Sequence, residues 1–101
     1  MRIHLATHGF QAGQALLDHT LRRVSAALSH FADQVVRVVV RVEDTNGPRG
    51  GLDKCCSITL QVPHLSPVVV AAVSPDYYDA VDRAARRAGR AARRAFERRW
   101  T

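Results

Sequence analysis

Arginine is concentrated near the end of the sequence, in the stretch "DRAARRAGRAARRAFERR". In a helix, at about 100° per residue, these arginines spread over roughly 140° of one side. Asp79 and Glu97 are the only acids on that side. Like charges in one stripe repel unless anions neutralise them, so the pattern predicts an uninterrupted cationic surface that binds a polyanion. Its arginines are Arg83, Arg86, Arg87, Arg90, Arg93, Arg94 and Arg98.

The chemistry of the guanidinium group favours nucleic acid as that polyanion, because the group pairs bidentately with phosphate and stacks on bases. A membrane is disfavoured because the opposite side of the helix is mostly alanine, which is too small to insert deeply among acyl chains. RNA is favoured over DNA because a basic helical face suits shape-reading of phosphate backbones and no base-reading motif is visible. The alternative is an ordinary solvated face, although such faces normally mix charge signs.

A loop longer than a tight hairpin needs is expected at residues 44–56, where the sequence reads "DTNGPRGGLDKCC". A glycine-rich backbone can approach folded RNA closely, so we expect Arg49 and Lys54 to meet phosphates there. The alternative is that Asn46 and Gly47 simply turn the chain and that the charges are incidental.

Catalytic and metal-binding chemistry finds little support in the residue spacing. The histidines are scattered without a metal-ligand pattern, at His4, His8, His19, His30 and His64. Cys55 and Cys56 are neighbours, so in a strand they point to opposite faces and neither a disulfide nor a shared metal is expected. The glycines of the loop join two strands and lack the following helix that forms a phosphate site. We expect no enzyme and no cofactor, and catalysis through His4 or His8 is the weakest alternative.

The composition is that of one small basic domain. The chain has 101 residues, enough for a single core. Lys and Arg number 15 against 9 Asp and Glu, which gives a net charge of +6, and Lys54 is the only lysine. Neither a signal peptide nor a membrane span is recognisable, and two reduced thiols suit the cytosol. We therefore expect a cytoplasmic protein without a membrane partner.

Alternation at Ile3, Leu5 and Thr7 predicts a first strand, and a helix is expected from about Gln11 to Phe31. The predicted buried stripe of this helix consists of Leu17, Leu21, Val24, Leu28 and Phe31. Its water-facing side is predicted to present His19, Arg22, Arg23 and His30.

Three strands follow, in the stretches "QVVRVVVRVED", "KCCSITLQV" and "VVVAAV". The first points Val36, Val38, Val40 and Val42 inward, and the second points Cys56, Ile58, Leu60 and Val62 inward. Both faces of the third are apolar, so the pattern does not decide which is buried. Ser74 as N-cap and Pro75 at the first helical position predict a last helix that continues to about Arg99. Its apolar side comprises Tyr77, Val81, Ala84, Ala85, Ala88, Ala92 and Ala95.

The predicted fold is therefore a single α+β domain over residues 1–101, in the order β-α-β-β-β-α. A strand, a helix and a strand suggest parallel neighbours, and the short turns afterwards suggest antiparallel pairing. Each helix has one apolar stripe, so both should cover one face of a four-stranded mixed sheet.

Three stretches carry a resemblance to a known family: "VVRVVVRVED", "NGPRGGLDKC" and the helix opening "DYYDAVDRA". The last is similar to the family's acidic and tyrosine pattern at Asp76, Tyr78, Ala80 and Asp82. Over nearly its full length the chain resembles the short ribosome hibernation-promoting factors, relatives of the ribosome-associated inhibitor. The resemblance puts Arg22 and Arg23 where members have lysines on the first helix. It also turns Val68, Val70 and Ala72 toward the helices and leaves Val69, Ala71 and Val73 outward.

The resemblance implies binding to the small ribosomal subunit between head and body, over the messenger and tRNA positions, which holds ribosomes inactive. The implied partners are that subunit and its rRNA, and a weak homodimer or an additional ribosome-dimerising protein stays open. The final helix departs from the family in being richer in Arg and Ala. The expected RNA-binding residues are Arg22, Arg23, Arg49, Lys54, Arg83, Arg86, Arg87, Arg90, Arg93 and Arg94.

The alternative function is a protein-interaction module. It would use the outward strip of Val69, Ala71 and Val73 for dimerisation or for docking a partner.

Overall fold

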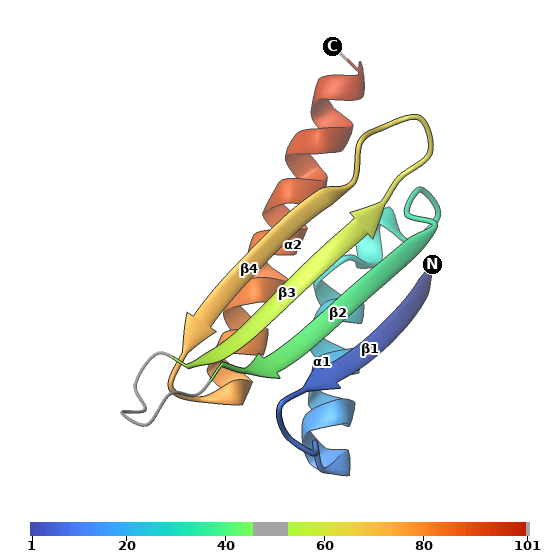
Figure 1. Cartoon of the computed structure of the whole chain (residues 1–101). Helices are drawn as coiled ribbons and strands as arrows, with labels where there is room; N and C mark the ends of the chain where they lie inside the picture. The colour runs from blue at the N-terminus through green and yellow to red at the C-terminus, as the bar shows by residue number, and fades with distance from the viewer. Residues whose placement is uncertain (46–52, 101) are drawn as a thin grey trace.

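The computed structural model describes residues 1–45 and 53–100 and confirms the predicted order of elements. A short 3-10 helix, η1, is the only addition within these residues. Figure 1 shows the elements in chain order. They are β1 (Arg2–His8), α1 (Gln14–Ala27), η1 (Ser29–Phe31), β2 (Arg37–Asp44), β3 (Lys54–Gln61), β4 (Val68–Ser74) and α2 (Tyr77–Trp100).

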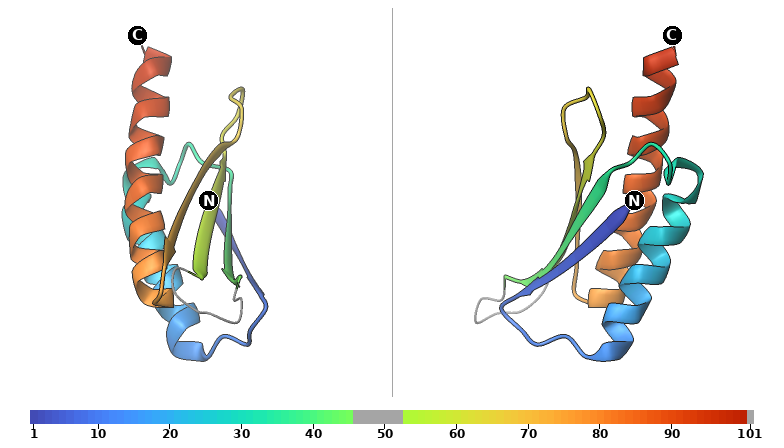
Figure 2. Two further views of the ribbon diagram at one scale, coloured as in Figure 1. Left: turned by 60° about the vertical axis from the view of Figure 1, so that its left-hand side comes forward. Right: turned by 90° about the vertical axis from the view of Figure 1, so that its right-hand side faces the viewer.

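The strands form one four-stranded mixed sheet in the order β1-β2-β3-β4. β1 and β2 are parallel, while β2 with β3 and β3 with β4 are antiparallel. One row across the sheet joins Leu5, Val40, Ile58 and Val70, so apolar residues meet on the same face in all four strands. Both helices lie on that face and leave the other face of the sheet uncovered, as Figure 2 shows. The predicted layer arrangement is confirmed.

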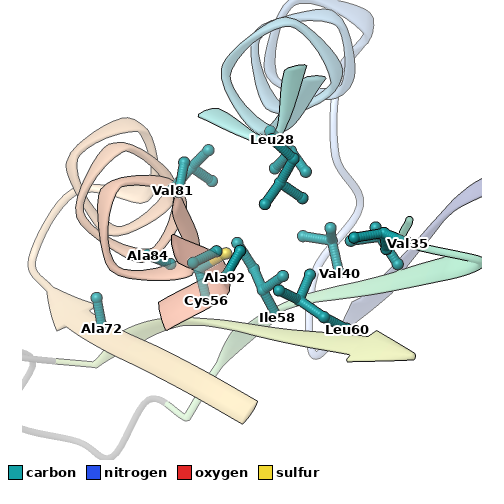
Figure 3. Packing of buried hydrophobic residues seen from close by; sticks show 14 of the residues in the cluster. Leu28, Val35, Val40, Cys56, Ile58, Leu60, Ala72, Val81, Ala84 and Ala92 are labelled. Atoms are coloured by element: carbon teal, nitrogen blue, oxygen red, sulfur yellow. The ribbon is translucent and has the colours of Figure 1, made fainter. Parts of the chain in front are cut away.

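The core lies between the sheet and the helices (Figure 3). The alternation of β2 and β3 buries the predicted inward residues from Val38 onward, and Ile58 at the centre is fully buried. Val36 is an exception to the prediction, because it precedes β2 and is 56% exposed. The amides of Gln34 and Val35 both bond the Phe31 carbonyl, and this turn interrupts the strand alternation.

The faces of β4 divide as the family resemblance implies. Ala72 is buried and Val70 packs against the core, whereas Val69 is 64% and Val73 is 46% exposed. The helices cover only one side of this strand, so the outward valines are left on the open face of the sheet.

Helix α1 is shorter than predicted and is rotated about its axis. It starts after Gly13, whose extended backbone forms the N-cap, and the fully buried Leu28 ends it. The buried residues recur in steps of four, at Leu16, Thr20, Val24 and Leu28. Thr20 can be buried because its hydroxyl donates to the Leu16 carbonyl at 2.7 Å. The prediction that Leu21 belongs to the buried stripe is wrong, since this residue is 40% exposed.

Helix α2 begins two residues later than predicted. Asp76, not Ser74, is the N-cap, because its side chain accepts a hydrogen bond from the Tyr78 amide at 2.8 Å. Ser74 is the last residue of β4, and its hydroxyl accepts a hydrogen bond from the Asp76 amide at 3.2 Å. Within the described residues, neither helix is both long and apolar enough to cross a membrane.

Candidate nucleic-acid interface

The arginines of α2 whose side chains the structure describes lie on the side of the helix that faces away from the sheet. The opposite side is a row of buried small residues that lets the helix lie close to β3 and β4. This division follows from the helical period, and it confirms the predicted apolar side of the helix. The side chain of Arg98 lies outside the described residues. The exposed arginines are Arg83, Arg86, Arg87, Arg90, Arg93 and Arg94.

The predicted uninterrupted cationic surface is broken at one edge by the protein's own acid. Arg83 Nε lies 2.9 Å from the Asp79 carboxylate, one helical turn away. The Ser74 hydroxyl donates to the same carboxylate at 2.8 Å. These contacts, with the Ser74 hydrogen bond the largest, lower the pKa of Asp79, and the charges of Arg83 and Arg86 act in the same direction. Arg83 is therefore partly neutralised.

Arg87 is held on the edge strand of the sheet. Its guanidinium donates a hydrogen bond to the main-chain carbonyl of Ala71 in β4. This contact fixes the side chain along the flank of the molecule, on the side of α2 away from α1. The guanidinium groups of α2 are thus divided between two directions.

Arg86, Arg90 and Arg93, hereafter the central arginines, are a part of the row without a salt bridge to a carboxylate of the described residues, although the charge of Arg86 acts on Asp79. At about 100° per residue they fall within roughly 60° of one another on α2. None of the three forms an ion pair within the part of the chain that the structure describes. All three are exposed and line the same hollow beside α1. This row is the cationic feature that matches an external polyanion best.

Helix α1 supplies a second set of positive groups, arranged differently from the prediction. Arg22 is exposed as expected, whereas His19 and Arg23 are half-buried and contact Asp82 on α2. His19 Nε2 lies 2.7 Å from Asp82 and the Arg23 Nε lies 3.1 Å from it. The Arg23 contact is an ion pair without hydrogen-bond alignment, because its Nε is buried and makes no hydrogen bond. The different rotation of α1 about its axis explains both corrections.

A hollow of about 430 Å³ lies between the two helices on their outer side. Its walls are positively charged, with Arg23 on α1 and the central arginines on α2. Ala26, Ala27, His30, Phe31 and Gly89 complete its lining. Gly89 explains how the helices come this close: a Cβ there would lie 3.0 Å from the Ala27 carbonyl oxygen. The hollow was not predicted, although a glycine within an alanine-rich helix face is the signal that could have indicated it.

Lys54 occupies a different environment from the one expected. Its ammonium lies 3.3 Å from Asp44 and 3.2 Å from Asp53, and 5.2 Å from the centre of the Tyr77 ring. Desolvation lowers the pKa of Lys54, but the hydrogen bonds and charges of Asp53 and Asp44 outweigh it and raise the pKa. Lys54 thus joins the two ends of the loop. Arg49 lies outside the described residues, and its phosphate contact stays a prediction.

The histidines and cysteines are dispersed over the region that the structure describes. No group of three or more metal-binding side chains is found among these residues. Cys55 and Cys56 are both free. Burial raises the pKa of Cys56 to about 12, so its thiol stays protonated and unreactive at neutral pH.

The family of this chain follows from its sequence over almost the whole length. Residues 3–100 match the family described as "Sigma 54 modulation protein / S30EA ribosomal protein". The chain belongs to this family. The predicted relationship to ribosome hibernation factors is thereby confirmed. A comparison with curated proteins finds no significant sequence match.

Two solved structures share the fold of this S30EA family member. A ribosomal subunit interface protein from Coxiella burnetii gives a TM-score of 0.74 at 19% identity, covering 88% of this chain and 90% of that one. The Protein Y N-terminal domain from Thermus thermophilus gives a TM-score of 0.69 at 20% identity, covering 88% of this chain and 92% of that one. At these identities the likeness establishes the common fold.

Proposed function

We propose that this protein binds the rRNA of the small ribosomal subunit in the messenger and tRNA channel and holds the ribosome inactive. Family membership supports a ribosomal role, and the similar protein from Coxiella burnetii is itself described as a ribosomal subunit interface protein. The observation that carries the proposal is the row of central arginines, which are exposed and form no ion pair within the described residues. Such a row binds phosphates in preference to the protein's own groups.

Each predicted RNA contact has a place in this proposal. The central arginines make the main phosphate contacts, together with Arg23 across the hollow. Arg22 extends the positive surface along α1, while the other exposed arginines of α2 flank the row. We assign Lys54 to the support of the loop base, since two carboxylates already match its charge. Arg49 remains the predicted phosphate contact of the loop itself. The flanking arginines of α2 are Arg83, Arg87 and Arg94.

Sedimentation of a cell lysate through sucrose gradients at low and high salt tests the proposal. We expect the protein to travel with the 30S and 70S fractions at low salt and to move to the top of the gradient as salt rises. Each phosphate contact contributes a slope of roughly 0.7 to 0.9 in log affinity against log salt. Protein that stays at the top of the gradient at low salt would contradict a ribosomal role.

A second candidate function uses the open face of the sheet. Val69 and Val73 are 64% and 46% exposed there, as a docking or dimerisation strip requires. Changing both to Thr should then abolish self-association in analytical ultracentrifugation and leave ribosome binding intact. This candidate would be removed if the wild-type protein is monomeric at all concentrations and the double Thr variant loses no binding partner.

A further inference from the structure

The hollow between α1 and α2 combines two kinds of surface that a simple phosphate-binding patch does not need. Its lining combines guanidinium groups from both helices with the small or apolar residues Ala26, Ala27, Gly89 and Phe31. Phe31 contributes a partly buried ring, which stacks on Phe96 with centroids 5.2 Å apart and meets His30 edge to face. A surface that only attracts phosphate gains nothing from an apolar and aromatic depression.

The hollow owes its depth to the small residues where the helices meet. Ala27 on α1 faces Gly89 on α2 and Ala26 also lines the hollow, and none of them has a side chain that could fill the space. Its volume of about 430 Å³ lies within the roughly 300 to 1,000 Å³ of ordinary small-molecule sites. A second hollow of about 360 Å³ shares His30, Phe31 and Arg93 with the first. The two hollows, here called the track, adjoin at these residues, and Gln34, Phe96 and the acidic Glu97 complete the lining of the second.

The chemistry of the track fits single-stranded nucleic acid. Unpaired bases are recognised by stacking on aromatic rings or guanidinium planes, while the backbone follows a positive groove. A fully paired duplex keeps its bases stacked inside and presents only phosphate and ribose, so it would leave the apolar part of the hollow in water. An unpaired nucleotide covers the apolar residues with its base and reaches the guanidinium groups with its phosphate.

We propose that the hollow between α1 and α2 is a pocket for one unpaired nucleotide of RNA. The base lies against Ala26, Ala27 and Phe31, and its phosphates contact Arg23 and the central arginines. This proposal rests on the proposed function and names the RNA that its surface selects. Selection of an unpaired nucleotide would direct the protein to single-stranded or bulged rRNA and not to regular helices.

Two labelled RNA probes test the pocket: a fully paired hairpin, and the same hairpin with a single unpaired adenosine in its stem. Fluorescence anisotropy measures the affinity of the full chain for each. We expect wild-type protein to bind the bulged hairpin about tenfold or more tightly than the paired one, in line with the usual contribution of one stacked base. Equal affinity for the two probes would overturn the proposal.

A groove-filling variant and its control separate the pocket from the charge. Ala26→Leu adds an apolar side chain to the lining of the hollow and keeps every charge and nearly the same helix propensity. Ser25→Leu adds similar bulk at an exposed neighbouring position that does not line the hollow. We expect Ala26→Leu to lose the preference for the bulge and to keep the affinity for the paired hairpin, while Ser25→Leu behaves as wild type.

The outcomes distinguish the pocket from the wider proposal. Retention of the bulge preference by Ala26→Leu, with circular dichroism showing a native fold, overturns the pocket. If ribosome co-sedimentation persists in that case, the proposed function stands without it. Wild-type protein that binds neither hairpin nor ribosomes overturns both.

Discussion

Gly89 offers a direct test of how closely α1 and α2 pack. In an exposed helix, Gly→Ala stabilises a protein by about 1 kcal/mol, because alanine is the better helix former. Gly89 is not in that situation, since a Cβ would lie 3.0 Å from the Ala27 carbonyl oxygen and 3.7 Å from the Ala27 Cβ. The first of these distances is shorter than an ordinary van der Waals contact, so the C-terminal end of α1 would have to shift.

The sign of the effect is decided by two magnitudes. Overpacking a close interface typically costs about 1 to 3 kcal/mol, which exceeds the gain of about 1 kcal/mol from helix propensity. We therefore expect Gly89→Ala to destabilise the protein by about 1 kcal/mol. For a domain of this size that corresponds to a decrease of about 4 to 8 °C in the unfolding temperature.

Thermal and urea unfolding, followed by circular dichroism, measure the change. The pair Arg22→Ala and Arg22→Gly calibrates helix propensity at an exposed position in the middle of α1, where nothing is packed. We expect the alanine variant of that pair to be the more stable by about 1 kcal/mol. If Gly89→Ala stabilises the protein by the same amount as this calibration, the close approach of the helices is refuted.

Two further predictions concern the start of α2. Asp76→Ala should lower the free energy of unfolding by about 1 kcal/mol, because the Tyr78 amide loses its hydrogen-bond acceptor. Asp76→Ser should restore most of this loss, and equal stability of all three proteins would contradict the assignment of the N-cap. The lowered pKa of Asp79 means that its stabilising contacts are present above its ordinary value of 3.8 and are lost as pH falls through the folded-state pKa. The unfolding temperature of wild type should therefore fall more steeply below pH 4 than that of Asp79→Asn, and parallel curves would show that the contacts contribute nothing.

The strands and the apolar side of α2 could be predicted because each depends on a local period. Val38, Val40 and Val42 alternate with residues of the open face, and the alanines of α2 recur on one helical side. These patterns determine which side is buried whatever the neighbouring element is. The prediction is wrong at Val36 only because the turn after η1 delays the start of the strand.

The rotation of α1 could not be read from hydrophobicity. Thr20 counts as polar in the sequence, yet its hydroxyl bonds the Leu16 carbonyl and the side chain is buried, while the apolar Leu21 is exposed. Because the buried stripe contains Thr20 and not Leu21, different charged residues of α1 face α2. His19 and Arg23 consequently meet Asp82, a residue whose role as their shared partner had no signal in the sequence.

The candidate site was predicted in its charge but not in its shape. Helical spacing places the arginines on one side, whereas the hollow depends on which residues of α1 oppose Gly89. The partners of Lys54 likewise depend on strand register, since β2 and β3 pair Asp44 with Lys54 directly. Contacts of this kind arise between distant parts of the chain, and no local pattern specifies them.

The most direct test of the central claim is the salt dependence of ribosome binding for two triple variants. One changes the central arginines to Gln, and the other changes the exposed Arg2, Arg37 and Arg41 on the open face of the sheet to Gln. Both lower the net charge of +6 by the same three charges. We predict that the first variant loses ribosome affinity and reduces the slope of log affinity against log salt by about 2 to 3, while the second keeps most of both. Equal losses in the two variants would show that overall charge, and not the row on α2, binds the ribosome.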